Sequence, residues 1–457
     1  MNRKGIYVAR LDERRAKGAE WRKQVPFAAQ TEWKPSANRA DPVETLIEQG
    51  KSRIPDLLPV RYARMKQDPF AFLRGAAAVM AADLAAGPST GLRVQACGDG
   101  HLGNFGGYAS PEGVPVFDVN DFDETLPAPF ECDVKRLATS LAVAGQVAKL
   151  PGHECRHLAR TAAKSYRRHL GKLALLSPLA AWSSRIDLAA AIAEVDSNKI
   201  RHQVEKRREA ALRGTREHYG LVERKNGDWK IKDKPPLVRH LHHHELHAHQ
   251  AFTSYAESLQ EDRRVLLQRY HRRDVAFKTV GVGSVGTFCA IGLFVADDGS
   301  PLLLQIKEAQ ASVLAPFAGA SDYANHGERV VIGQRMMQAA PDFFLGWTLN
   351  PVNGRHFYVR RLKDSRLANL GAMLEETLPY YAKLCGHTLA RAHARSGDAV
   401  MLSAYMGGDS EFDKAIAEFA IAYADQTKRD WRGLVDAIKA GRISAEEQHA
   451  PADSVAS

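Results

Sequence analysis

The chain has 457 residues, of which 45% are hydrophobic and 25% charged, a composition typical of globular proteins that excludes disorder for most of the sequence. At roughly 150 residues per folding unit, this length predicts about three units or one large two-lobed domain. No stretch approaches the ~18 consecutive apolar residues of a transmembrane helix, so we expect no membrane partner. The net charge of +10 is compatible with nucleic acid, an anionic membrane surface or a phosphorylated substrate.

The cysteines and the N-terminus both favour a cytoplasmic protein. Five cysteines lie far apart and form no CxxC pair, a pattern that suggests neither disulfide bonds nor a cysteine zinc site. The first residues are charged and lack the apolar stretch of a secretory signal. We therefore expect a reducing, cytoplasmic environment.

In chain order, the hydrophobic pattern predicts a polar arm, a helical segment, a β-rich segment and a second helical segment. The main predicted elements are a helix at 69–86, short strands at 92–96 and 114–119, antiparallel strands at 275–280, 287–295 and 301–307, a helix at 327–340, a strand at 356–362, and helices at 375–395 and 411–424. The predicted units are an N-terminal arm (1–60), a helical lobe (61–265), a β-rich lobe (266–365), helices that complete the helical lobe (366–444) and a disordered tail (445–457).

A GxGxxG pattern, weak on its own, lies in the β-rich segment. Its residues Gly281, Gly283, Ser284 and Gly286 are followed by a second apolar strand, TFCAIGLFV, whereas a dinucleotide-binding motif needs a helix at that point. A Walker loop is excluded because no Gly-Lys-Ser/Thr follows. Glycines at the tip of a hairpin are typical of the flap that covers the nucleotide phosphates in protein kinases. We therefore predict that these four residues contact a nucleotide.

Lys307 is predicted on the third strand of the same meander, within LLLQIKEA. A lysine among apolar strand residues is costly unless its ammonium group meets an anion. In the kinase scheme this lysine binds the α- and β-phosphates and pairs with a helix glutamate, for which Glu328 is the first candidate and Glu308 the second. The alternative is a lysine that extends its charged end to solvent from a half-exposed strand.

The loop at residues 97–104 holds Asp99 and Asn104 five residues apart between two predicted strands. In kinases an Asp at this spacing receives the proton of the acceptor hydroxyl, and the Asn holds Mg²⁺. An Asx-rich turn would contain the same two residues. The longer text Gly-Asp-x-His-x-Gly-Asn resembles the GDxHxxN loop of aminoglycoside and choline phosphotransferases, which adds His101 to the catalytic candidates. Asp133 lies in text that resembles a phosphotransferase helix start, where the Asp supports this loop.

Four acidic residues follow within seven positions: Asp118, Asp121, Asp123 and Glu124. Because such carboxylates repel one another, a hard cation is a natural partner, and an acidic surface loop is the alternative. The text Asp121-Phe122-Asp123 resembles the Asp-Phe-Asp of small-molecule kinases, in which the first Asp binds Mg²⁺. The predicted metal ligands are therefore Asp121 and Asn104, with Asp118 as the alternate and Asp123 beside them.

Two biased segments suggest other kinds of site. Residues 240–249 hold six histidines, but HELH is one residue short of the HExxH zinc motif, so we interpret them as a solvated face or an adventitious metal site. A basic helix is predicted at 199–216. Such a run is more often a solvated face with i,i+4 charge pairs than a phosphate-binding surface, and the lack of interleaved aromatic residues argues against binding of single-stranded nucleic acid. Nucleic acid is accordingly not expected to be the main partner.

The kinase-like elements occur in reversed order along the chain. The catalytic loop precedes the glycine flap by about 180 residues, whereas it follows the flap in kinases. A circular permutation accounts for this order. It requires the end of the helix predicted at 375–395 to lie within ~15 Å of residues 92–98.

Nearly the whole chain resembles a family of uncharacterised bacterial proteins, domain of unknown function 2252. The resemblance rests on RMKQDPFAFLRG (64–75), CGDGHLGNFG (97–106), VFDVNDFDET (116–125), DVKRLATS (133–140), GVGSVGT (281–287), GQRMMQ (333–338), YVRRLKD (358–364) and LARAHARSGD (389–398). The family implies a kinase-like fold and no established substrate. Phe70, Arg74, Arg360 and Arg361 belong to family motifs without a kinase counterpart, and we expect them either to line the acceptor site or to serve packing.

The sequence thus predicts an α+β, protein-kinase-like two-lobed fold, circularly permuted, that binds ATP and Mg²⁺ between its lobes. The predicted activity is phosphoryl transfer to a hydroxyl group of an unidentified small-molecule or protein acceptor. One alternative is transfer of AMP, with the nucleotide bound in the opposite direction. Others are a non-catalytic nucleotide-binding protein and a nucleic-acid-binding protein.

Overall fold

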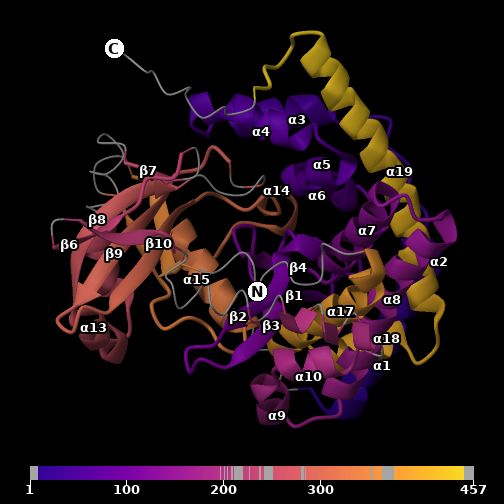
Figure 1. Cartoon of the computed structure of the whole chain (residues 1–457). Coiled ribbons are helices and arrows are strands. Elements are labelled where there is room, and N and C mark those ends of the chain that lie inside the picture. The colour runs from indigo at the N-terminus through magenta and orange to yellow at the C-terminus, as the bar shows by residue number, and fades with distance from the viewer. Residues whose placement is uncertain are drawn as a thin grey trace.

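Strands and helices separate into two parts that lie side by side in Figure 1, the main sheet on the left and most helices on the right. The computed structural model describes residues 9–446 except 196, 200, 203, 207–208, 210–219, 226, 236–237, 241–250, 279–282, 284, 351–353 and 363–374. The mixture of helix and antiparallel sheet agrees with the predicted α+β class.

The main sheet has six strands in the order β11-β12-β10-β9-β8-β7, and the pairings between them are antiparallel. The strands are β7 (Val238–Arg239), β8 (Tyr270–Lys278), β9 (Cys289–Ala296), β10 (Pro301–Ala309), β11 (Gly346–Leu349) and β12 (His356–Arg361). The strands predicted in this part correspond to β8, β9, β10 and β12 and are confirmed. β7 and β11 were missed because two to four residues are too few for a periodic pattern.

The sheet has an apolar interior, which explains the long hydrophobic runs in its sequence. Seven of the eight residues of β9 are buried, so this strand has no polar alternation. Helix α15 (His326–Met337), predicted at 327–340, packs on β10, β11 and β12. A separate hairpin of β5 (Val222–Lys225) and β6 (Asp228–Ile231) contacts β8 and β9.

The second part is built from helices that pack around α8 and α17. Its helices are α1 (Leu11–Gln24), α2 (Phe27–Thr31), α3 (Pro42–Gly50), α4 (Leu58–Met65), α5 (Pro69–Gly75), α6 (Ala77–Ala85), α7 (Glu131–Val147), α8 (Gly152–Leu173), α9 (Pro178–Ser183), α10 (Leu188–Ala193), α17 (Leu378–Ser396), α18 (Ala399–Met406) and α19 (Glu411–Lys439). Helix α13 (Glu261–Leu267) lies beside the main sheet in Figure 1, and the short α14 (Ala315–Ala318) contacts α6. Helices α7 and α8 contact each other, both pack against α17 and α19, and the four helices share a large buried core. None of the described helices is long and apolar enough to cross a membrane.

Two predicted helices differ from the structure. The helix expected at 69–86 is divided into α5 and α6 at Ala76, where φ is −112° and ψ 37°. At the end of α5, a Cβ on Gly75 would lie 2.5 Å from Met65 Sδ, so α4 packs tightly against this break. Helix α19 continues well beyond the predicted residue 424 because its buried positions recur along its whole length.

The N-terminal segment predicted as an arm is instead packed on the helical part. A Cβ on Gly18 would lie 2.2 Å from the carbonyl oxygen of Met401, so α1 and α18 are in close contact. The Arg14 guanidinium donates two hydrogen bonds to Asp398, at 2.7 and 2.6 Å. Small residues and ion pairs hold α1 in place, which explains why its sequence shows no apolar face.

Four short strands connect the two parts. Strand β1 (Arg93–Ala96) pairs with β4 (Leu126–Pro129), and β2 (Phe105–Ala109) pairs with β3 (Pro115–Val119). The backbone N–H of Gln95 in β1 donates to Ser396 Oγ at the end of α17, at 2.9 Å. This contact satisfies the distance condition that the permutation hypothesis set.

Three predicted segments lie wholly or largely outside the described residues. They are the histidine run at 240–249, most of the basic segment at 199–216 and the tail after residue 446.

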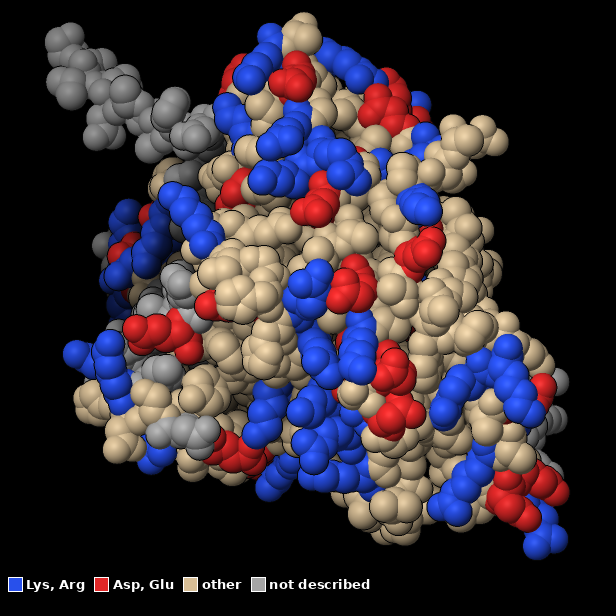
Figure 2. All heavy atoms as spheres, turned by 90° about the vertical axis from the view of Figure 1, so that its right-hand side faces the viewer, with Lys and Arg blue, Asp and Glu red and all other residues tan. Residues whose placement is uncertain are grey.

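On the helical side viewed in Figure 2, Lys and Arg side chains gather in several groups with Asp and Glu among them.

Candidate functional site

The Asp99 loop follows β1 and is fixed by the first turn of α7. The Asp133 carboxylate accepts hydrogen bonds from the backbone N–H groups of Cys97 at 2.7 Å and Gly98 at 3.0 Å. His393 Nε2 lies 3.1 Å from the same carboxylate. Gly98 adopts φ +80°, a conformation that favours glycine. The predicted supporting role of Asp133 is confirmed by these contacts.

Asp99 and Asn104 are linked within this loop. Asn104 Nδ2 donates to the backbone carbonyl of Asp99 at 2.7 Å, and the Asp99 carboxylate accepts from Arg136 Nε at 2.5 Å. Burial raises the pKa of Asp99 above its ordinary value, although Arg136 acts in the opposite direction. A buried carboxylate with a raised pKa is suited to receive a proton from a hydroxyl group.

His101 is buried beside the loop and supports its shape. Its Nδ1 accepts a hydrogen bond from the backbone N–H of Gly103 at 3.0 Å, and its Nε2 lies 3.7 Å from Asp99 Oδ2. Burial and the nearby positive charges of Arg74 and Arg136 hold the pKa of His101 well below its ordinary value. A neutral imidazole in this position orients the loop and is poorly suited to deliver a proton.

The acidic loop after β3 meets Lys307 of β10. Lys307 Nζ donates to Asp123 Oδ2 at 2.6 Å and lies 3.8 Å from Asp121 Oδ1, and Tyr358 Oη donates to Asp123 Oδ1 at 2.6 Å. Burial alone would raise the pKa of Asp123, but Lys307 and Tyr358 bring it down to about 2. Burial and the neighbouring Asp123 raise the pKa of Asp121. One carboxylate is therefore neutralised by the protein, and the other is only partly compensated.

The structure gives two of the predicted site residues, Lys307 and Asp118, other partners than expected. Lys307 is paired with Asp123 and Asp121 rather than with Glu328, which opens α15. Asp118 is buried in an ion pair with Arg391 and accepts from the backbone N–H of Ala339 at 3.2 Å. Its carboxylate is thus engaged in the helical core, which removes the alternate metal ligand from the cleft.

The glycine-rich connection lies between β8 and β9, as predicted. Gly281 and Ser284 are outside the described residues, whereas Gly283 and Gly286 are described. The carbonyl of Gly286 accepts from the backbone N–H of Ile54 at 2.7 Å, and the carbonyl of Val285 accepts from Arg53 Nη1 at 2.6 Å. The segment before α4 therefore holds the end of this connection against the helical part.

Residues of these loops line two adjoining cavities. Asp99, Asn104, Asp121, Asp123 and Gly283 all line the inner one. The outer cavity, of about 690 Å³, shares Asp123 and Gly283 with it and falls in the usual size range of small-molecule sites. The residues predicted from three separate motifs are thus brought together in one place. Lys307 reaches the site through its ion pair with Asp123.

Within the described part of the chain, no group of three His, Cys, Asp or Glu side chains forms a ready-made metal site. Magnesium is usually held by one or two carboxylates together with waters and substrate phosphates. Asp121 and Asp123, with the Asn104 side chain, are the residues that match this mode of binding in the inner cavity.

Sequence reasoning missed several residues of this site. Arg136 and Tyr358 lie inside the quoted motifs, but nothing in the pattern shows that they touch Asp99 and Asp123. Glu124 was noted only as part of the acidic run. It lines both cavities, and burial raises its pKa to about 7.

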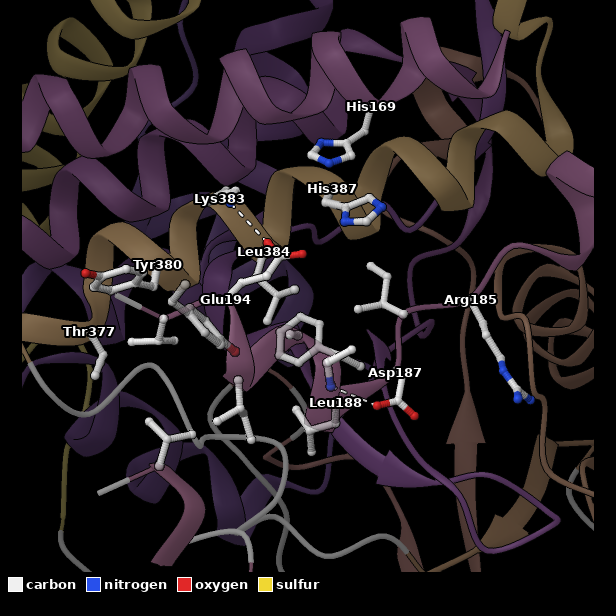
Figure 3. Close-up of a pocket in the computed structure, with 18 residues that line it drawn as sticks. His169, Arg185, Asp187, Leu188, Glu194, Thr377, Tyr380, Lys383, Leu384 and His387 are labelled. Atoms are coloured by element: carbon white, nitrogen blue, oxygen red, sulfur yellow. Dashed lines mark hydrogen bonds and ion pairs between the residues drawn. The ribbon is translucent and has the colours of Figure 1, made fainter. Parts of the chain in front are cut away.

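A further cavity, of about 310 Å³, lies among α8, α10 and α17 and is lined mainly by apolar side chains. Figure 3 shows His169 and His387 together at one end and Lys383 paired with Glu194. The two imidazole rings stack 3.7 Å apart, and burial lowers the pKa of both. None of the predicted site residues lines this cavity.

These features define a protein of helices and antiparallel sheet with a charged cleft where the two parts meet. Residues 53–437 match the model of a family described as uncharacterized proteins conserved in bacteria, DUF2252. Because the match spans most of the chain, the chain belongs to this family, as the motifs predicted. No curated protein and no solved structure matches the chain.

Proposed function

We propose that the protein is a nucleotide- and Mg²⁺-dependent phosphotransferase of kinase-like, circularly permuted fold. One observation carries the proposal: Asp99, Asn104, Asp121 and Asp123 line a single cavity, although they come from two different loops. Phosphoryl transfer needs positioned charges and little covalent chemistry from the protein. This combination of an amide, carboxylates and a buried lysine supplies such charges.

Two further observations support a permuted kinase-like arrangement. Helix α17 ends against β1, so the helix that would precede the catalytic loop in an unpermuted chain adjoins that loop in space. The antiparallel order β8, β9, β10 places the glycine-rich connection and Lys307 on one continuous meander. Both are expected of a kinase-like nucleotide lobe.

The residues of the cleft fit a nucleotide with its metal ion. Asp121 is a carboxylate with a raised pKa and one-third side-chain exposure, so a cation beside it would relieve a real electrostatic cost. The outer cavity has room for a nucleoside, and Gly283 lies where the outer and inner cavities meet. A bound Mg²⁺ would supply charge neutralisation at the transferred phosphate.

In this proposal the side chains have distinct roles. Asp99 orients the acceptor hydroxyl and receives its proton, while Arg136 and His101 fix the direction of its carboxylate. Asp121, Asp123 and Asn104 hold the cation. Lys307 contacts the nucleotide phosphates when the cation occupies Asp123, because its ammonium lies only 2.6 Å from that carboxylate.

The test is nucleotide binding measured by calorimetry, with and without Mg²⁺, for the wild type, Asp121→Asn and Asp436→Asn. Asp436 is an exposed carboxylate on α19 and serves as the matched control. We expect Mg²⁺-dependent ATP binding that is lost in Asp121→Asn and unchanged in Asp436→Asn. Absence of ATP binding by the wild type, or equal binding by Asp121→Asn, would refute the proposal.

The product of a turnover separates phosphoryl transfer from AMP transfer. Phosphoryl transfer releases ADP, whereas AMP transfer releases pyrophosphate. Incubation with γ-labelled and α-labelled ATP therefore identifies which group remains with the acceptor.

A cytoplasmic location is proposed on chemical grounds, because all five cysteines are free thiols.

A further inference from the structure

Three arginines from the N-terminal region converge on the inner cavity. Arg53 precedes α4, Arg61 lies within α4, and Arg74 lies at the end of α5. All three line the cavity that also contains Asp99 and Asp121. The catalytic loop, the acidic loop, the lysine and the glycine flap of the kinase-like scheme do not include them.

Arg61 is buried, Arg53 and Arg74 are partly buried, and each has a buried guanidinium nitrogen with hydrogen-bonding capacity left unused. Arg61 is 1% exposed and donates through Nη2 to the Gly75 carbonyl at 2.8 Å, but among the described residues its Nε and Nη1 have no hydrogen-bond partner. The buried Nε groups of Arg53 and Arg74 likewise have no hydrogen-bond partner in the described ranges. Within the described part of the chain, no carboxylate lies within ion-pair distance of any of the three.

This arrangement of the three arginines carries an electrostatic cost. A buried guanidinium without a counter-ion carries a large desolvation penalty. Burial lowers the pKa of all three arginines, and that of Arg61 falls to about 9 with repulsion from Arg53 contributing. Such a cost is typical of a binding site that is completed by its ligand.

The positive groups face acidic groups across the cavity. Asp99 and Asp121 attract Arg74, and Glu124 and Asp123 attract Arg53, yet no direct ion pair closes this gap. A tetrahedral oxyanion accepts hydrogen bonds from several guanidinium groups at once. A metal ion bound to the carboxylates would face the oxygens of the oxyanion that the arginines leave free.

We propose that Arg53, Arg61 and Arg74 form an oxyanion pocket that receives a phosphate group directly opposite the carboxylates of the cleft. Oxyanion binding stands on the arginine geometry alone. Which phosphate enters rests on the proposed function: it is either the terminal phosphate of the nucleotide or a phosphate of the acceptor.

The first experiment measures the thermal unfolding of the full chain with inorganic phosphate or sulfate, against chloride at equal ionic strength. We expect both oxyanions, but not chloride, to raise the midpoint of the wild type. Arg61→Met and Arg74→Met should each weaken oxyanion binding by about 10- to 100-fold, the range for hydrogen bonds to charged groups. Without oxyanion, each variant should unfold at the same temperature as the wild type or above it, because an unpaired buried charge is removed.

Arg64→Met is the matched control, because Arg64 lies one turn from Arg61 on α4 and does not line the cavity. It should keep the wild-type response to phosphate. Two test variants are needed because Arg61→Met also removes the hydrogen bond from Arg61 to the Gly75 carbonyl, whereas Arg74→Met leaves that bond in place. A structural arginine would instead give a less stable protein with an unchanged oxyanion response.

The second experiment distinguishes the two sources of phosphate. Inorganic phosphate is titrated into the protein saturated with Mg²⁺ and β,γ-imido-ATP. Competition assigns the pocket to the terminal phosphate of the nucleotide, and continued binding assigns it to an acceptor phosphate. Phosphate binding without any nucleotide binding would refute the proposed function and leave the oxyanion pocket intact.

Two results would overturn the oxyanion pocket. One is a wild type that responds equally to phosphate, sulfate and chloride. The other is a phosphate response that survives unchanged in both Arg61→Met and Arg74→Met.

Discussion

Replacing Lys307 by methionine tests how the cleft balances its charges. Lys307 is almost fully buried and is ion-paired with Asp123 at 2.6 Å. Methionine fills a similar volume and removes only the ammonium group. In Lys307→Met, Asp123 loses its charge partner while it stays in contact with Tyr358.

The size of the effect follows from the pKa of Asp123. Its pKa lies at about 2 against an ordinary value of 3.8, a difference that is worth about 2 kcal/mol of folding free energy at neutral pH. Breaking a buried ion pair by removing one partner costs about 3–5 kcal/mol in general. We therefore expect Lys307→Met to lose between about 2 and 5 kcal/mol at pH 7, a large share of typical stability.

The sign of the pH dependence is fixed by the same numbers. In the wild type the stabilisation from Asp123 is complete above pH 3.8 and is lost as the pH falls towards 2. In Lys307→Met, burial acts without the lysine and raises the pKa of Asp123, so the carboxyl group is protonated at higher pH. The stability difference between the two proteins should therefore shrink as the pH falls from 7 to about 4.

Urea denaturation at pH 7 and at about pH 4 measures this difference. Lys414→Met is the matched control, because Lys414 is exposed on α19 and pairs with Glu411 one turn away. The control should stay within about 0.5 kcal/mol of the wild type. Equal stability of Lys307→Met and the wild type at pH 7, or a deficit that does not change with pH, would refute the reasoning.

Three other substitutions test separate parts of the structure. Arg391→Leu leaves Asp118 buried and unpaired, so thermal denaturation should show a loss of about 3–5 kcal/mol that Asp118→Asn partly restores; an unaffected midpoint would contradict this. Gly327→Ala places a Cβ 2.0 Å from a backbone carbonyl oxygen of β12 and should cost more than about 2 kcal/mol, whereas Gly433→Ala, with open space around it, should gain up to about 1 kcal/mol. Burial raises the pKa of Glu124 from 4.5 to about 7, so the stability of the wild type should fall by about 3 kcal/mol as the pH rises from 4.5 to 7. Glu124→Gln removes this carboxyl group and should flatten the pH dependence of stability over the same range. An unchanged slope would count against the prediction.

Much of the sheet could be predicted because its signals are local. The apolar runs of β8, β9 and β10, broken by glycines and by Asp298-Gly299, show both the strands and their antiparallel order. The site loops were found for a related reason. Asp99 and Asn104 lie within six residues, so their motif can be recognised without knowledge of the fold.

The partners of the site residues could not be predicted, because long-range contacts decide them. Asp118 and Asp121 are three residues apart and look equivalent in sequence. Only the fold shows that Arg391, more than 270 residues away, takes Asp118 out of the cleft. Glu328 was predicted as the partner of Lys307 by analogy with kinases, but Lys307 pairs instead with Asp123, which lies 184 residues away in the sequence.

The N-terminal region was underestimated for a different reason. Its helices are anchored by ion pairs, such as Arg14 with Asp398, and by the close approach of Gly18 to α18. Neither feature produces an apolar period in the sequence. Arg53 and Arg61 were missed for the same reason. They look like ordinary surface charges in the sequence, and only the packing of α4 and the segment before it shows that they line the cavity.

The ion pairs of the cleft predict that metal and nucleotide bind cooperatively. Lys307 is ion-paired with the Asp123 carboxylate, so a cation that binds Asp123 must displace an ammonium group. A phosphate that attracts Lys307 removes that competitor, and by linkage the cation then favours the phosphate equally. Calorimetry of ATP binding at several Mg²⁺ concentrations should therefore show stronger coupling in the wild type than in Lys307→Met. Comparing the two proteins cancels the association of Mg²⁺ with ATP in solution. Equal coupling in both would mean that Lys307 and the metal do not compete for Asp123.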